Sequence, residues 1–198
     1  MNRLGMMVDV SHPSKASMMQ TVALSKAPII ASHSAVRSLA NHSRNMADEQ
    51  LLALKKNGGV IRIVAFASYL KVSPTPAGGR GGRGIRATEA EPCPIEDADA
   101  PPAPVNPDRA TVKDFVDHID YAVKLIGVDH VGISSDMDGG GGVDGWNSAA
   151  ETFNVTLELV RRGYTEEQIG KIWSGNLLRV LEQCEKVAKD IQSGKIAM

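Results

Sequence analysis

The chain has few cysteines and few aromatic residues, and it carries no excess of charge of either sign. Its two cysteines, Cys93 and Cys184, form no CxxC pair and no disulfide framework, so a secreted disulfide scaffold is not expected and a reducing compartment is compatible. Aromatic residues make up only 4% of the chain, so aliphatic side chains and methionine must build the core. A net charge of −1 gives no reason to expect nucleic acid or an anionic membrane surface as a partner.

Long apolar runs are also absent. No run approaches the roughly 20 residues that a membrane-spanning helix needs, so no membrane segment is expected. The first residues contain one arginine before residue 14, a short apolar run and no small-residue cleavage site, which does not fit a signal peptide. We therefore expect a cytoplasmic protein. Because Leu4–Val10 has the composition of a buried core, the chain is expected to begin inside a domain.

Four short apolar runs predict buried β-strands, and segments with helical spacing lie between them. The predicted strands are Met6–Val10, Ile29–Ser32, Val60–Ala65 and His130–Ser134. The predicted helices are Ser14–Ser25, Asp48–Lys56, Thr111–Ile126, Ala149–Arg162 and a last one opened by a capping box at Thr165–Gln168. We expect Ser174–Asn176 to break or bend this last helix. Strands that alternate with helices predict an α/β fold with parallel pairing and right-handed crossovers.

Residues 72–110 differ in composition from the rest of the chain. Eight of the ten prolines fall here, together with the run GGRGGRG at 78–84, so we predict a long exposed loop between two structured parts, residues 1–71 and 111–198. The glycine spacing within this run matches a dinucleotide-binding fingerprint, but no strand directly precedes it and no helix follows. Two arginines are too few to favour RNA binding.

Two histidines follow apolar runs with the same Ser-His ending. His12 and His33 are separated by 21 residues, about the length of a strand, a helix and two tight loops in a βα repeat. Asp136 follows the last predicted strand, so all three side chains are expected at the carboxyl edge of one sheet, where barrel enzymes hold metals. A single buried histidine or a single Asp-Gly turn is more often structural, and the repetition favours a metal site. A calcium loop from Asp136 is excluded, because Gly140 and Asn147 occupy ligand positions.

The polar loop after His33 contains a candidate anion-binding residue. Arg44 lies eleven residues beyond His33, and an arginine on such a loop can hold a carboxylate with two parallel hydrogen bonds. The remaining histidines are expected to be less important for chemistry. His118 lies within an amphipathic helix and His130 begins its strand, so we predict structural roles for both.

Five segments, in the same order, resemble the membrane (renal) dipeptidase family, and the bacterial members most of all. These segments are Asn2–His12, Ala31–Ala35, Ser43–Asp48, Asp129–Gly139 and Gly175–Val180. The likeness extends over residues 1 to about 70 and about 110 to 187. It implies a metal-dependent, amidohydrolase-like hydrolase with a TIM-type (β/α)8 barrel, two zinc ions or other divalent metals per complete site, and a dipeptide as substrate.

The resemblance also implies roles for individual residues. His12 and His33 correspond to the two histidines that ligate one of the paired zinc ions. Arg44 corresponds to the arginine that binds the free carboxylate of the dipeptide, and Asp136 to the acid/base aspartate that handles the proton of the attacking water. Asn147, on the loop after Asp136, is expected to line the substrate pocket.

Other parts of the family's site lie outside the matching segments. A His-x-Asp metal pair, a glutamate that bridges the metals and a further substrate-binding histidine all precede the segment that corresponds to Met1. A complete barrel takes about 250 residues and eight strands, so this chain is expected to be its C-terminal half. Either a missing N-terminal half or a second copy in a homodimer would complete such a barrel.

Two functions remain open at this point. The first is a zinc dipeptidase of which this chain carries part of the active site. The second is a non-catalytic barrel fragment that binds at most one metal and dimerises. A small doubly wound phosphate-binding domain is disfavoured, because no glycine-rich phosphate loop follows the first strand.

Overall fold

A four-stranded parallel sheet organises the computed structural model, which describes residues 1–71 and 109–197. The strands are β1 (Val8–Asp9), β2 (Ile29–Ser34), β3 (Val60–Val64) and β4 (Val131–Ser134), and they lie in the sheet in chain order. All three pairings are parallel, for example Val8 with Ile29 and Ile61 with Val131. The predicted α/β class and parallel pairing are confirmed, and all carboxyl ends of the strands lie at one edge.

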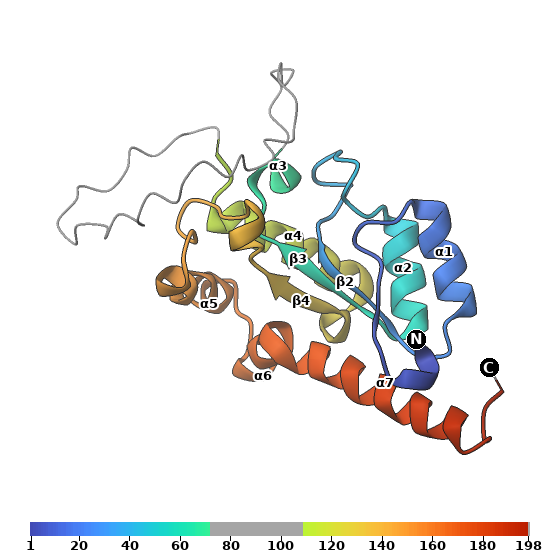
Figure 1. Cartoon of the computed structure of the whole chain (residues 1–198). Coiled ribbons are helices and arrows are strands. Elements are labelled where there is room, and N and C mark those ends of the chain that lie inside the picture. Colours follow the sequence, from blue (N-terminus) through green and yellow to red (C-terminus); the bar gives the residue numbers. More distant parts are fainter. Residues whose placement is uncertain (72–108, 198) are drawn as a thin grey trace, which may run out of the picture.

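Helices connect the strands and follow the last of them (Figure 1). They are α1 (Lys15–Leu24), α2 (Asp48–Asn57), α3 (Ala67–Leu70), α4 (Val112–Ile126), α5 (Thr152–Arg161), α6 (Glu166–Gly170) and α7 (Asn176–Gln192). Short 3₁₀ turns occupy Asn2–Leu4, Val128–His130, Met137–Gly139 and Ala149–Glu151. Within the described ranges, no helix combines the length and apolar character needed to cross a membrane.

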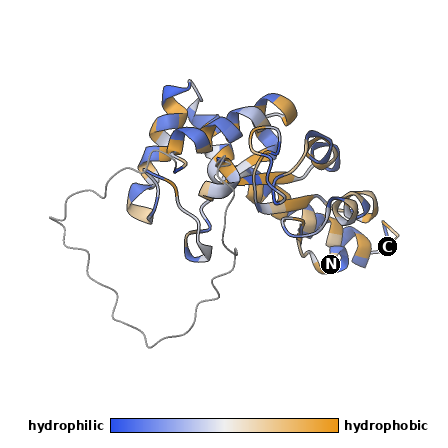
Figure 2. Cartoon of the chain, turned by 90° about the horizontal axis from the view of Figure 1, so that it is seen from above, coloured by the Kyte–Doolittle hydropathy of each residue, from blue (hydrophilic) through white to orange (hydrophobic). Residues whose placement is uncertain are grey.

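Alternate residues of the strands pack against helices on opposite faces of the sheet. Ile29 and Ile61 belong to the main core, which α2 and α4 cover, as Phe115 on α4 illustrates. Ile30 and Val60 form a smaller cluster with residues of α7, including Cys184. Figure 2 shows that apolar residues concentrate in the central sheet, whereas the surrounding helices carry both apolar and polar residues. The period of two along each strand thus gives the sheet two covered faces.

Helix boundaries follow the predicted capping signals. The Thr111 hydroxyl accepts a hydrogen bond from the backbone N–H of Asp114, and the Asp114 carboxylate accepts one from the backbone N–H of Thr111, so this capping box opens α4. Thr165 and Gln168 form the predicted capping box of α6. Gly58 ends α2 in the left-handed conformation with φ 84°, which glycine adopts without a steric cost.

Two predictions about local structure were wrong. Leu4 and Met6 are 61% and 51% exposed, so the predicted core segment Leu4–Val10 contributes only its last residues to the core. The reason is that β1 is an edge strand of two residues, preceded by a turn that packs on α7. Of the predicted break or bend at Ser174–Asn176, the break is also wrong, because a π-helical turn, Lys171–Gly175, continues α6 into α7.

The predicted exposed loop, 72–110, lies outside the described residues except for its last two. Ala110 is buried in the main core. Its carbonyl accepts a hydrogen bond from the backbone N–H of Asp144, so Ala110 is part of the folded core.

His118 joins α4 to two other segments, as its predicted structural role requires. The buried ring accepts a hydrogen bond from the Val36 backbone at 3.1 Å through Nδ1, and its Nε2 donates to the Leu70 carbonyl at 3.1 Å. The bond from Val36 needs an unprotonated Nδ1, so a ring that makes both bonds is the neutral imidazole with its proton on Nε2. Burial lowers the pKa of His118, and its hydrogen bond to Leu70 and two nearby aspartates only partly oppose this.

Replacing His118 by leucine is expected to lower the free energy of unfolding by about 1–3 kcal/mol at pH 7.5, because the Val36 N–H loses its partner. In the parent protein this free energy should also fall on acidification through the ordinary histidine range, since the unfolded chain then binds the proton more readily than the folded one. Urea titrations at pH 7.5 and pH 5.5 measure both effects. An unchanged pH slope in His118→Leu would show that His118 is not the group responsible.

Candidate metal and substrate site

The two Ser-His histidines meet at the carboxyl edge of the sheet. The Nε2 atoms of His12 and His33 lie 2.8 Å apart, and the ring planes are inclined by 60°. His12 is exposed and His33 is half-buried. Two imidazole nitrogens that point at one place from neighbouring strands can ligate one metal ion.

A local irregularity in β2 positions His33. The register runs from Ala31 opposite Ile61 to Ser34 opposite Ile63, so three steps along β2 span two steps along β3. Such bulges redirect side chains and are frequent beside active sites. The bulge places His33 next to His12, which follows the end of β1, because the two strands are neighbours in the sheet.

A network of hydroxyls and one carboxylate lies behind His33. Asp9 Oδ1 accepts hydrogen bonds from the backbone N–H groups of Ser11 and Ser32 at 3.1 and 3.0 Å and from the Ser11 hydroxyl at 3.0 Å. Asp9 Oδ2 accepts from the Ser32 hydroxyl at 2.6 Å. Ser32 Oγ also lies 2.7 Å from His33 Nδ1, and the His33 backbone N–H donates to Ser11 Oγ.

The electrostatics of the site favour an ionised Asp9 and a neutral His12. Burial acts to raise the pKa of Asp9, but hydrogen bonds from Ser32 and Ser11 outweigh it and the net shift is downward. Partial desolvation lowers the pKa of His12, and the nearby Arg44 and His33 lower it further, against Asp9 and Asp136. At neutral pH the His12 imidazole is therefore available as a ligand.

The donor set fits part of a zinc shell. Two nitrogens on one tetrahedral zinc, each at about 2.0–2.1 Å, are about 3.3 Å apart, so a small opening of the 2.8 Å pair accommodates the ion. Among residues 1–71 and 109–197, no group of three or more His, Cys, Asp or Glu side chains could hold a metal. In the described part of the chain, His12 and His33 thus offer two nitrogens that can ligate a metal, and no third His, Cys, Asp or Glu side chain joins them.

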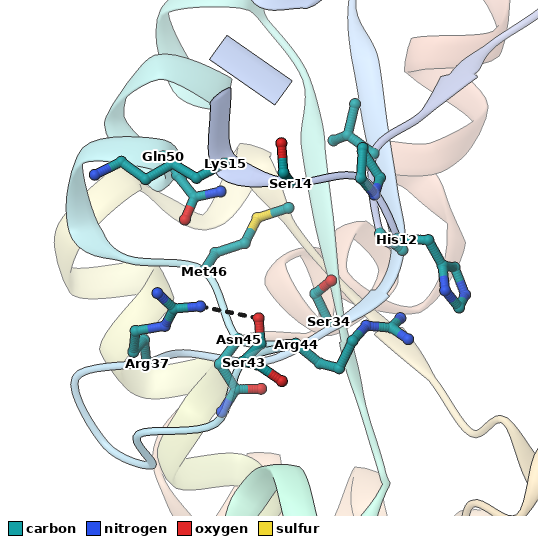
Figure 3. A pocket seen from close by; sticks show the side chains of 13 residues that line it. His12, Ser14, Lys15, Ser34, Arg37, Ser43, Arg44, Asn45, Met46 and Gln50 are labelled. Carbon is teal, nitrogen blue, oxygen red and sulfur yellow. Dashed lines mark hydrogen bonds between the residues drawn. The ribbon is translucent and has the colours of Figure 1, made fainter. Parts of the chain in front are cut away.

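Arg44 and His12 line one pocket (Figure 3). The Arg44 guanidinium lies 5.6 Å from the Tyr69 ring centre, and Tyr69 is itself stacked on His42 at 4.5 Å. The Nε and Nη2 atoms of Arg44 are buried and lack a partner within the described structure. By contrast, Nη2 of Arg37 donates to the Ser43 carbonyl. A buried guanidinium with unpaired donors is suited to a bidentate anionic ligand.

Asp136 follows β4 and has a strained backbone conformation. It is the single non-glycine residue with positive φ in the described ranges, at 52°, a region that aspartate tolerates better than most residues. Its carbonyl accepts hydrogen bonds from Gly139 and Gly141 at 3.0 and 2.7 Å, which hold this conformation. The carboxylate is close enough to His12 to oppose the net lowering of the His12 pKa, so Asp136 lies near the histidine pair.

Asn147 lies in a different environment from the histidine pair and Arg44. Its Oδ1 accepts a hydrogen bond from Arg109 at 2.5 Å, and its backbone N–H donates to Glu151. None of its hydrogen bonds within the described ranges connects it to the histidine pair or to Arg44. Its place in a substrate pocket stays a prediction.

The other histidines have structural partners. His130 bonds through Nδ1 to the Gly59 carbonyl at 2.8 Å, in agreement with its predicted role. His118 and Asp120 form a His-x-Asp sequence, but it is not a metal pair. Both ring nitrogens of His118 are hydrogen-bonded to backbone groups. Asp120 accepts hydrogen bonds from Arg162 and Tyr164 at 2.7 Å each.

Asp9 and Ser32 are residues of this site that the sequence did not predict. The available signal was the short spacing from a carboxylate at the end of β1 to His12, and the serine that precedes His33. Each is common by chance. Their link to the site is seen only in the structure, where the parallel pairing of β1 and β2 brings Asp9 within 2.6 Å of the Ser32 hydroxyl.

Comparisons with known proteins agree on one family. Residues 1–195 match the family model described as membrane dipeptidase (peptidase family M19). Dipeptidase ataJ of Aspergillus terreus is 39% identical over 185 residues, which are 93% of this chain and 37% of ataJ. The chain thus spans less than two-fifths of this curated relative.

Solved structures give the same result. The probable dipeptidase PvdM of Pseudomonas aeruginosa has a TM-score of 0.74 and 36% identity, over 94% of this chain and 52% of PvdM. A metallo peptidase of Rhodobacter sphaeroides, liganded with a phosphinate mimic of the dipeptide L-Ala-D-Ala, has a TM-score of 0.70 at 24% identity, over 92% of this chain and 44% of that protein. The second likeness concerns the fold.

Proposed function

Since this chain belongs to the membrane dipeptidase family (peptidase family M19), we propose that it carries one part of a binuclear zinc site that hydrolyses dipeptides. The observation that carries the proposal is the convergence of the His12 and His33 Nε2 atoms, 2.8 Å apart, at the sheet edge that also holds Arg44 and Asp136. Metallopeptidase relatives imply a metal cofactor, and imidazole nitrogens are common zinc ligands.

His12 and His33 would hold one of two zinc ions. When bound, zinc polarises a carbonyl oxygen and makes water a stronger nucleophile at neutral pH. The chain's own contribution is to aim both imidazoles at one point and to keep His12 neutral, which the bulge in β2 and the lowered pKa of His12 support.

Arg44 would bind the free carboxylate of the dipeptide. Its unpaired Nε and Nη2 atoms can donate two parallel hydrogen bonds, a geometry that matches a carboxylate. The Tyr69 ring 5.6 Å from the guanidinium would help to fix its orientation. The distance from this anchor to the metals would set the length of the substrate.

Asp136 would act as the acid/base group. Its carboxylate would take a proton from the attacking water and deliver it to the nitrogen of the leaving amino acid as the amide C–N bond breaks. The left-handed backbone at φ 52° is a strained conformation of the kind found where a side chain must be aimed.

The remaining ligands would come from residues beyond this set of strands. We propose that the four parallel strands correspond to the C-terminal half of a (β/α)8 barrel and that the other half, or a second copy of the chain, completes both the barrel and the metal site. Among the described residues, β1 and β4 each lack a strand partner on their outer edge, which supports this, because unpaired edges favour a strand partner. The alternative is a non-catalytic fragment that binds at most one metal.

An Arg44→Met variant tests the function. For the zinc-loaded protein we expect the KM for a dipeptide to rise about 10- to 100-fold, because a charge-assisted pair is lost, while the KM for the C-terminal amide of the same dipeptide changes little. Steady-state kinetics with both substrates measure this. Equal changes for acid and amide would remove the carboxylate-binding role, and no turnover by a parent protein that holds two zinc ions per site would favour the non-catalytic alternative.

A further inference from the structure

The hydrogen bonds that link Asp9, Ser32 and His33 have defined donors and acceptors. Asp9 Oδ1 is committed as an acceptor, because two backbone N–H groups and the Ser11 hydroxyl donate to it. The contact from Ser32 Oγ to Asp9 Oδ2, at 2.6 Å, lies in the range of a hydroxyl that donates to an ionised carboxylate. Ser32 Oγ also lies 3.3 Å from Ser11 Oγ, but the much shorter contact to the carboxylate takes the single hydroxyl proton of Ser32.

This leaves Ser32 Oγ as an acceptor toward its other partner. His33 Nδ1 lies 2.7 Å away, so the proton of that hydrogen bond must come from the ring. A neutral imidazole carries one N–H, and with that N–H on Nδ1, the Nε2 lone pair of His33 is free. It faces His12 Nε2 at 2.8 Å, which then donates in the metal-free protein.

We propose that Asp9 is a positioning residue, which fixes the His33 tautomer through Ser32 and so presents the Nε2 lone pair of His33 to the metal. The proposal rests on the proposed function, since the lone pair matters as a metal ligand. In many metal sites a carboxylate bonds directly to the ligating histidine. Here a serine hydroxyl lies between them, and the polarity of the whole chain depends on Asp9.

The chain of hydrogen bonds can be reversed by one substitution of nearly the same shape. In Asp9→Asn, the side-chain oxygen can still accept from the backbone N–H groups of Ser11 and Ser32, and its NH₂ would then point at Ser32 Oγ. Ser32 would donate to His33 Nδ1, and the ring proton would move to Nε2. The variant should thus block the ligand lone pair while the fold is retained.

The test reads the tautomer directly in the metal-free protein. Long-range ¹H–¹⁵N correlation spectra of the labelled chain resolve the five histidines, and a His33→Gln spectrum assigns His33. We expect the Nδ1–H tautomer for His33 in the parent protein and the Nε2–H tautomer in Asp9→Asn. Ser11→Ala is the matched control, because Ser11 contacts the same carboxylate but not the His33 ring, and it should keep the parent tautomer.

Zinc affinity provides the second measurement. In competition with a chromophoric chelator, Asp9→Asn should bind zinc about 10- to 100-fold more weakly than the parent protein, the usual cost of losing an outer-shell partner. A parent His33 protonated on Nε2, or an Asp9→Asn variant with the parent tautomer, would overturn the proposal. If instead the tautomers are as expected but the parent binds no zinc, the metal-site function fails and the tautomer control by Asp9 stands.

Discussion

His12→Ala is expected to weaken zinc binding by about 100- to 1,000-fold, with little change in the free energy of unfolding. Four-ligand zinc sites contribute about 10–16 kcal/mol in total, so the loss of one ligand corresponds to roughly 2.5–4 kcal/mol. His12 is exposed and its ring nitrogen contacts His33 rather than the core, so its truncation leaves no cavity. Isothermal titration with zinc, together with urea unfolding, measures both quantities.

A different histidine supplies the control for this experiment. His130 is half-buried and bonds to the Gly59 carbonyl, on another part of the sheet, so His130→Ala should keep the parent zinc affinity. The ligand role of His12 would be wrong if both variants lost affinity equally. It would also be wrong if His12→Ala unfolded while the folded fraction retained its zinc.

Asp136→Asn should lower kcat for dipeptide hydrolysis by about 100- to 10,000-fold, the usual contribution of a positioned acid/base group. Asparagine is nearly the same size and tolerates the positive φ of 52° at this position, so the fold should be kept. Zinc content should be unchanged, because Asp136 is assigned proton transfer and not metal binding. Turnover of a saturating dipeptide by the zinc-loaded protein measures the effect.

Asp138, two residues further along, is exposed and belongs to the same turn. Asp138→Asn removes an equal charge, so it should leave kcat within the error of the parent protein. Similar losses in the two variants would mean that the negative charge of the loop matters, and not a proton transferred at Asp136. Loss of zinc from Asp136→Asn would reassign this carboxylate as a metal ligand.

The sequence predicts most of the fold because buried parallel strands have a distinctive pattern. Val60–Val64 is rich in branched residues, Ile29–Ser34 begins with two isoleucines, and helix and turn signals flank both. The structure places both strands within two residues of the predicted ends. The edge of the sheet follows a weaker rule. Met6 is apolar yet 51% exposed, since apolar composition alone does not show whether a neighbour covers the strand.

The candidate site divides in the same way. Repeated Ser-His endings and the parallel order of the strands are sufficient to expect His12 and His33 on one edge. The bulge that aims His33 is not encoded by any glycine or proline in β2, so it appears only in the strand register. Asp9 and Ser32 depend on contacts across two strands, and no local spacing announces them. Asn147 follows Asp136 on the same loop and bonds to Arg109, and its place in a substrate pocket stays a prediction.

In the proposed site, His12 and His33 hold the same metal ion. Zinc K-edge X-ray absorption on the protein with one equivalent of zinc tests it most directly, because imidazole rings give characteristic multiple scattering and Zn–N distances of about 2.0–2.1 Å. If His12 and His33 hold the same ion, the spectra show two imidazoles per zinc in the parent protein and one in His12→Ala. Zinc bound through oxygen ligands alone, or the same imidazole count in both proteins, would contradict it.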